Sequence, residues 1–197
     1  MVITFKKLSA MLLTVISVAL CSCSDDHPDE YLFVGDSIVK RWDIQGSFPT
    51  LITYNKGYFG SGIDYLNNFT GRCDGKYVVV LSGTNNILDA FTEAQINSFA
   101  ESFTSSIAGM GAKHVYVISI LPRSFETDGP HFNENIDRVN HAIRERLQDV
   151  PSATYVDVHD EFSDGNGGMK VQYSYDGLHL NSFGYEILTD KLNDYIL

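Results

Sequence analysis

The chain has 197 residues, of which 44% are hydrophobic and 20% are charged, and its formal net charge is −11. This length suits one domain, and the composition is that of a globular protein, which excludes general disorder. A strongly acidic surface disfavours nucleic acid as a partner. The three cysteines are too few for a disulfide framework. We therefore expect one acidic globular domain that does not bind nucleic acid.

The N-terminal segment has the pattern of a targeting signal. Two lysines precede an apolar run from Leu8 to Leu20, which is too short to span a bilayer and fits a signal peptide. The run continues into Cys21-Ser22-Cys23, which resembles a bacterial lipoprotein signal. Cys23 follows the small residue Ser22, whereas Cys21 follows bulky Leu20, so Cys23 is the expected site of lipidation. Ordinary secretory cleavage without a lipid is the alternative.

This pattern divides the chain into three parts. We expect a lipoprotein signal peptide at residues 1–22, an acidic tether at residues 23–30 and one folded domain at residues 31–197. The expected location is the bacterial cell envelope, outside the cytoplasm, with the N-terminal lipid as the membrane contact. Cys73 lies in a turn-like Gly-Arg-Cys-Asp-Gly stretch, and we interpret it as structural.

Short apolar runs predict five strands in the domain. Their continuous β-branched composition indicates strands that are covered on both faces, as in a parallel sheet. The predicted strands are residues 31–34, 52–54, 77–81, 114–120 and 154–158.

Helices are predicted between these strands. Thr92-Glu93-Ala94-Gln95 forms a capping box before an apolar stripe that stops at Gly111. A second stripe runs from Ile136 to Leu147, and Asn181 can cap a last helix. One more helix is expected from Gly62 to Asn68. Alternating strands and helices predict a three-layer α/β fold, in which ligands bind beyond the carboxyl ends of the strands.

Four short motifs lie where such a site is expected. Gly-Asp-Ser at 35–37, Asn-Lys-Gly at 55–57 and Gly-Thr-Asn-Asn at 83–86 follow the first three strands, and Asp-Gly-Leu-His stands at 176–179. Each motif alone is weak, because it could serve as a helix cap or a turn. The four together, in this order, form a specific pattern.

The pattern resembles the SGNH (GDSL) hydrolase family, whose sequence blocks supply Ser, Gly, Asn and His in turn. The resemblance extends from about Tyr31 to Leu197. It implies a flavodoxin-like fold with a mainly parallel five-stranded sheet in the strand order 2-1-3-4-5. It also implies a catalytic triad of Ser37, His179 and Asp176.

The same resemblance implies three oxyanion-hole donors, which are the backbone N–H groups of Ser37 and Gly57 and the side-chain amide of Asn85. Two departures from the family pattern are visible. Asn86 stands where many members have Asp, and Phe59 stands where a small residue is common. The second departure weakens the assignment of Gly57.

These residue types suit acyl transfer. A serine hydroxyl becomes a good nucleophile when a histidine takes its proton, and a carboxylate holds that histidine in the required tautomer. Fixed N–H donors stabilise the oxyanion that forms. The glycine-rich signatures of other enzyme classes (Gly-x-Ser-x-Gly, the P-loop and Gly-x-Gly-x-x-Gly) are absent from the sequence.

We therefore predict a lipid-anchored serine esterase that cleaves short acyl esters, first of all O-acetyl groups on carbohydrates, with no metal and no cofactor. Polar loops at residues 123–131 and 161–168 are expected to leave little apolar surface for a long acyl chain. A lysophospholipase or thioesterase of the same family is one alternative. A catalytically silent glycan-binding lipoprotein is the other.

Overall fold

The structure is a computed structural model that describes residues 28–197. The expected signal peptide, Cys23 and most of the tether lie outside the described residues. The described residues contain one sheet of five parallel strands in the order β2-β1-β3-β4-β5. The predicted fold class and strand order are therefore confirmed. The strands are β1 (Glu30–Gly35), β2 (Ile52–Gly57), β3 (Tyr77–Leu81), β4 (His114–Ile118) and β5 (Ala153–Val156).

Helices connect the strands, and short 3-10 turns stand in several of the loops. The α-helices are α1 (Ser37–Arg41), α2 (Ile44–Ser47), α3 (Glu93–Ala108), α4 (Phe132–Leu147), α5 (His159–Phe162) and α6 (Ser182–Ile196). The 3-10 helices are η1 (Ile63–Phe69), η2 (Thr84–Asn86) and η3 (Val171–Tyr173).

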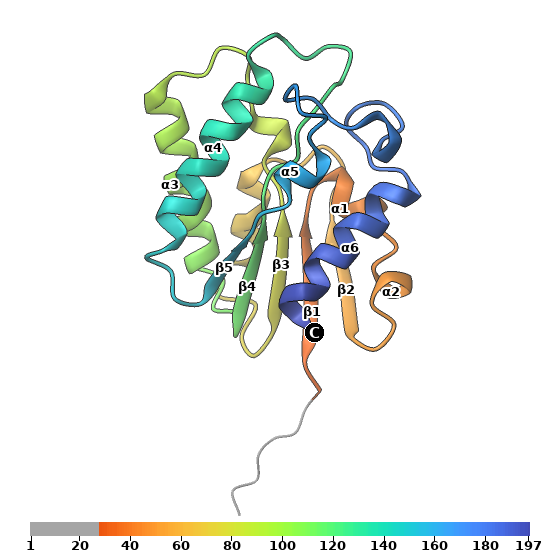
Figure 1. Ribbon diagram of the computed structural model, residues 1–197. Helices are drawn as coiled ribbons and strands as arrows, with labels where there is room; N and C mark the ends of the chain where they lie inside the picture. The colour runs from red at the N-terminus through yellow and green to blue at the C-terminus, as the bar shows by residue number, and fades with distance from the viewer. Residues whose placement is uncertain (1–27) are drawn as a thin grey trace, which may run out of the picture.

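The helices form two layers, one on each face of the sheet (Figure 1). One layer contains η1, α3 and α4, which pack with Leu32 and Val34 of β1, and we call it the α3–α4 layer. The other contains α1, α2, α5 and α6, which pack with Phe33 of β1, and we call it the α1–α6 layer. β1 and β3 are buried on both faces, which explains their continuously apolar sequences, whereas the edge strand β2 is mostly exposed.

Several element boundaries differ from the predicted ones. The stretch expected to be a helix from Gly62 to Asn68 is a 3-10 helix. α3 ends at a cap on Gly109, two residues before Gly111. β4 ends at Ile118, before the predicted end at Ile120, because the backbone N–H and C=O of Ile120 bond the side-chain amide of Asn140 on α4, at 2.9 and 2.8 Å. A backbone bonded to a side chain in this way leaves the sheet ladder.

The two edges of the sheet have different roles. All five strands point the same way, so the four predicted motifs meet at the carboxyl edge, at the top of Figure 1. The chain enters at the opposite edge, where Asp29 pairs with Lys113 at 2.8 Å and Glu30 pairs with Lys76. Glu30, the last residue of the expected tether, is already the first residue of β1. Within residues 28–197, no helix is both long and apolar enough to cross a membrane.

Candidate active site

Ser37 stands at the junction of β1 and α1. Asp36 caps α1, and its Oδ1 accepts a hydrogen bond from the Ile38 N–H at 2.9 Å. Ser37 is then the first helical residue, and 7% of its surface is exposed. The cap turns the chain sharply between strand and helix, and this places the Ser37 hydroxyl at the carboxyl edge of the sheet.

Two hydrogen bonds connect Ser37 to a histidine and a carboxylate from the C-terminal part of the chain. The Ser37 Oγ lies 3.1 Å from His179 Nε2. The His179 Nδ1 lies 2.8 Å from Asp176 Oδ2. A histidine whose Nδ1–H donates to a carboxylate presents its Nε2 lone pair to the serine, and this tautomer can accept the hydroxyl proton.

The loop that carries Asp176 is closed by its own hydrogen bonds. Asp176 Oδ1 accepts from the backbone N–H groups of Leu178 and His179, at 3.0 and 2.7 Å. The Ser174 hydroxyl donates to the His179 carbonyl at 2.8 Å. Leu178 and Leu180 are buried, as expected for anchors of this segment. The carboxylate and the imidazole are therefore fixed relative to each other before any substrate binds.

The same hydrogen bonds control the charge of Asp176. Burial alone would raise the pKa of this carboxyl, but the bonds from the His179 ring and from the two backbone N–H groups lower the pKa to about 2. Asp176 is therefore ionised across the physiological pH range, as a partner of an imidazolium must be.

Asn85 lies in η2, the 3-10 helix that follows β3. Its Nδ2 donates to the Ser61 carbonyl at 2.9 Å, and the Ser61 hydroxyl donates to the Gly35 carbonyl at 3.1 Å. One N–H of the Asn85 amide is thereby used for positioning, and the second is available to a ligand. Asn86 has a separate task, because its Oδ1 accepts from the Ile63 N–H at 2.9 Å and holds the start of η1.

Gly57 does not offer the free donor that the sequence predicted. Its N–H donates to Asn55 Oδ1 at 2.9 Å, within the same strand end. The Asn55 amide in turn bonds the carbonyls of Val39 and Trp42 beneath α1. A Cβ at position 57 would overlap the backbone of Lys40. The Gly57 N–H is therefore already hydrogen-bonded in this structure, its oxyanion role stays a prediction, and the close approach of β2 to α1 is enough to require glycine here.

Gly60, three residues after Gly57, is a backbone N–H donor that the sequence analysis did not consider. It lies in the turn in which the Ser61 N–H bonds the Tyr58 carbonyl at 3.2 Å, and its φ of +70° favours glycine. Among the described residues, the Gly60 N–H has no hydrogen-bond partner. Its neighbour Ser61 is tied to Gly35, so this turn is held against the strand that carries Ser37.

A buried arginine behind the site was also missed. Arg123 donates to the Thr84 carbonyl at 3.2 Å, and its guanidinium pairs with Asp128 at 2.6 and 3.1 Å. The side chains of this pair are only 10% and 9% exposed. Thr84 directly precedes Asn85, so Arg123 holds the turn on which the amide stands. In the sequence, Arg123 looks like one more polar residue of an exposed loop.

The capping residue Asp36 has an unusual charge state. It is 1% exposed, and burial raises its pKa to about 7, although the Ile38 N–H and the positive charge of Arg123 oppose the shift. A carboxyl group with this pKa is partly neutral near pH 7. The part of the chain that the structure describes contains no cluster of three or more His, Cys, Asp or Glu residues arranged to hold a metal ion.

Comparisons with known proteins agree with this geometry. The sequence profile of the GDSL-like lipase/acylhydrolase family matches residues 33–187. The chain belongs to this family. It is accordingly an acylhydrolase, and its parallel five-stranded sheet is that of the SGNH hydrolases.

Three similar proteins illustrate the family. Platelet-activating factor acetylhydrolase IB subunit alpha1 of Pongo abelii is 29% identical over 88% of this chain and 78% of its own length. The O-acetyltransferase OatA of Staphylococcus aureus is 32% identical over 60% of this chain and 16% of its own length. A solved Streptococcus pneumoniae structure described as a platelet activating factor is 28% identical, with a TM-score of 0.70 over 89% of this chain and 87% of that one.

Proposed function

We propose that this acylhydrolase is a serine esterase that removes short acyl groups, above all O-acetyl groups, from carbohydrates. The observation that carries the proposal is the continuous hydrogen-bond chain from Ser37 through His179 to Asp176 at the carboxyl edge of the sheet. In this arrangement, a nucleophile, a base and an ionised carboxylate lie in the order that acyl transfer requires.

The reaction proceeds in two halves. Ser37 Oγ attacks the ester carbonyl while His179 Nε2 takes its proton, and the charge on the imidazolium is stabilised by Asp176. The tetrahedral intermediate collapses when His179 returns that proton to the leaving alcohol, and an acyl-enzyme remains on Ser37. A water molecule then attacks the acyl-enzyme while His179 takes its proton, and His179 returns that proton to Ser37 Oγ as the carboxylic acid leaves.

The oxyanion needs donors on the side of Ser37 that faces away from His179. We assign this role to the Ser37 N–H, the second N–H of the Asn85 amide and the Gly60 N–H, which replaces the donor expected from Gly57. The support is that Asn85 and the Gly60 turn are both tied to Ser61 and that the Gly60 N–H is unused. Preorganised donors of this kind are each worth about 10²–10³ in kcat.

The preference for short acyl groups rests on two observations. The names of two relatives, an acetylhydrolase and an O-acetyltransferase, both refer to an acetyl group, removed in one case and transferred in the other. The loops after β4 and α5 are polar in sequence. In the first of them, the Arg123 and Asp128 side chains pair with each other and are nearly buried. Each methylene of an acyl chain adds about 0.8 kcal/mol of favourable binding free energy only where it is buried against an apolar surface.

A lysophospholipase or thioesterase of the same family is the second candidate. It is favoured by three exposed apolar side chains that follow β2 and β3, namely Tyr58 (63% exposed), Phe59 (55%) and Leu88 (53%). Exposed apolar side chains that gather near a site can receive a lipid chain.

A series of aryl esters from acetate to octanoate tests these readings on the purified domain. For a short-chain esterase we expect kcat/KM to peak at acetate or propionate and to fall at least tenfold by octanoate. A profile that rises through octanoate would favour the lipid-cleaving candidate. Absence of hydrolysis with any ester, in a folded protein that still binds glycans, would favour a silent glycan-binding protein.

We also propose that the protein is a lipoprotein anchored through Cys23 outside the cytoplasm. The support is the Leu-Cys-Ser-Cys sequence at residues 20–23 and the direction of β1, which begins at the edge of the sheet opposite Ser37. Such an anchor would leave the site facing away from the membrane. Labelling of cells with a fatty-acid analogue should mark the wild type and Cys21→Ala but not Cys23→Ala. A lipid on Cys21, or a mature protein with no lipid, would contradict this proposal.

A further inference from the structure

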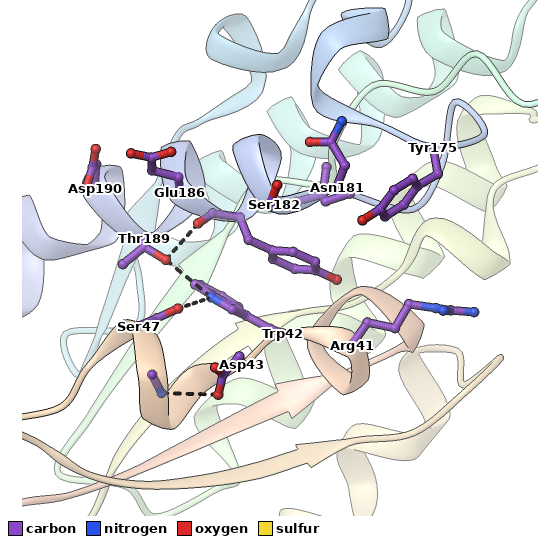
Figure 2. Close-up of a pocket in the computed structure, with 13 residues that line it drawn as sticks. Arg41, Trp42, Asp43, Ser47, Tyr175, Asn181, Ser182, Glu186, Thr189 and Asp190 are labelled. Carbon is purple, nitrogen blue, oxygen red and sulfur yellow. Dashed lines mark hydrogen bonds between the residues drawn. The ribbon is translucent and has the colours of Figure 1, made fainter.

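A groove lies between α1 and α2 on one side and α6 on the other (Figure 2), and its lining includes chain neighbours of the triad residues. Its cavity is about 690 Å³, a size typical of small-molecule sites. At one end stand Arg41, on the helix that Ser37 begins, and Tyr175, which directly precedes Asp176. Asp190 stands at the other end (Figure 2). We call this cavity the α6 groove.

The groove lies on the histidine side of Ser37. The loop that carries His179 runs directly into α6 and belongs to the α1–α6 layer, as the groove does. Asn85, in contrast, bonds to Ser61, which comes two residues before η1 in the chain, and η1 belongs to the α3–α4 layer. Because His179 must give its proton to the leaving alcohol, the alcohol part of the ester has to lie on the histidine side. The α6 groove is therefore beside the leaving group.

The wall of the groove is rigid and aromatic. Trp42 is 3% exposed, and its Nε1–H lies 3.1 Å from Ser47 Oγ and 3.3 Å from Thr189 Oγ1. The Tyr185 ring stacks on Trp42 with 6.0 Å between the ring centroids, and its hydroxyl donates to the Ile38 carbonyl at 2.7 Å. Trp42 is buried and supports the wall, whereas the half-buried Tyr185 ring lines the groove and has surface left for a ligand. The polar atoms of both rings are already hydrogen-bonded.

The rim of the groove is polar and mostly acidic. Asp43, Glu186 and Asp190 line it, against a single cation, Arg41. Glu186 and Asp190 form no ion pair with any residue in the described range, so their oxygens are available as acceptors. An excess of carboxylates disfavours phosphate-bearing ligands, and acceptors beside aromatic faces suit the hydroxyls and the C–H faces of a sugar ring.

We propose that the α6 groove binds the sugar that carries the ester, as a neutral carbohydrate of one or two rings. This proposal rests on the proposed esterase function, because it takes the sugar to be the leaving alcohol of the reaction at Ser37. It adds a binding site to that function, with Tyr175 and Arg41 at the triad end and Glu186 and Asp190 farther along α6.

The test compares two substrates in the same variants, with acetylcholine as a third for comparison. One is a mono-O-acetylated disaccharide, and the other is 4-nitrophenyl acetate, whose alcohol has no hydroxyls to bind. Ser182→Trp should fill the groove from an exposed position, and Glu186→Ala should remove an acceptor. Asp194→Ala is the matched control, since Asp194 is exposed on the same helix but does not line the groove.

We expect the ratio of kcat/KM for the sugar ester to kcat/KM for the aryl ester to fall at least tenfold in Ser182→Trp. A fall of about threefold is expected in Glu186→Ala, and none in Asp194→Ala. An unchanged ratio in both groove variants would overturn the proposal and leave the esterase function standing. A loss confined to acetylcholine, run as a third substrate, would overturn it in favour of a cationic alcohol. Failure of the wild type to cleave 4-nitrophenyl acetate would refute the esterase function itself, and the groove proposal with it.

Discussion

The two sides of Ser37 are built in different ways. On the histidine side, the positioning bonds of Asp176 and His179 come from residues 174–179, within one loop. On the oxyanion side, the Asn85 amide is held by Ser61 and its turn by Arg123, which come from separate loops. A locally closed loop is encoded by a short motif, whereas a site assembled from distant loops depends on how those loops pack. The predictions that follow test this contrast.

The largest expected effect is on the histidine side. In Asp176→Asn, the side-chain oxygen can still accept from the Leu178 and His179 N–H groups, but the Nδ2 that replaces Oδ2 cannot accept from His179 Nδ1. The histidine is then held in the wrong tautomer, and we expect kcat to fall by about 10⁴ with the fold intact. The measurement is kcat on 4-nitrophenyl acetate together with thermal unfolding. Asp164→Asn is the matched control, because Asp164 also accepts loop N–H groups but contacts no histidine.

The next effect concerns the side-chain donor of the oxyanion side. Asn85→Ala should lower kcat by about 10²–10³ with a much smaller change in KM, because the contact is tightest in the transition state. Asn86→Ala should leave kcat within a few-fold and reduce stability by about 1 kcal/mol, since it removes the acceptor of the Ile63 N–H. Equal losses of kcat in the two variants would mean that the turn, rather than one donor, determines activity.

A smaller effect distinguishes Gly60 from Gly57. Cys73 is the only cysteine among residues 28–197, so a synthetic segment of residues 28–72 can be ligated there to the rest of the domain. Glycolic acid at position 60 replaces the N–H by an ester oxygen, and we expect it to lower kcat at least tenfold. The same exchange at position 57 removes only the bond to Asn55 and should leave kcat within threefold. The reverse outcome would restore Gly57 as the donor.

The smallest effect on activity is expected at Asp36, where stability should change instead. Burial raises its pKa in the folded protein to about 7, above the 3.8 of an unperturbed aspartate. The folded state therefore holds the proton more tightly, and stability falls as the pH rises from about 4 to 7. Asp36→Asn keeps the helix cap and removes this cost. We expect the variant to gain up to a few kcal/mol over the wild type between pH 4 and 8, as measured by urea unfolding. A stability difference that does not depend on pH would contradict the buried-carboxyl interpretation.

The fold could be predicted well because its signals are long. Val78, Val79 and Val80 are buried in β3, the middle strand of the sheet. A run of β-branched residues like this one indicates a strand without reference to the rest of the chain. The five-residue α1 and the four-residue α2 are too short to show a helical period, so the sequence did not predict them. The start of η1 is bonded to the side chain of Asn86, a residue from another loop, and the sequence of η1 does not contain that information.

The site shows the same difference between contacts within one short segment and contacts between distant segments. Asp176 and His179 are three residues apart, and their pairing follows from the motif and the loop around it. Gly57 is the last residue of β2 and Gly60 follows three residues later, and the structure distinguishes them because the N–H of Gly57 is hydrogen-bonded to Asn55. The role of Arg123 could not be predicted from the sequence, because its partner Thr84 is 39 residues away in the chain.

The central claim is that Ser37 is the nucleophile, and active-site labelling tests it most directly. The folded domain would be treated with a fluorophosphonate and the modified residue identified by peptide mass spectrometry. We expect one equivalent of label on the peptide that contains Ser37 and no label in Ser37→Ala. Label on a different serine, or label that persists in Ser37→Ala, would contradict the mechanism.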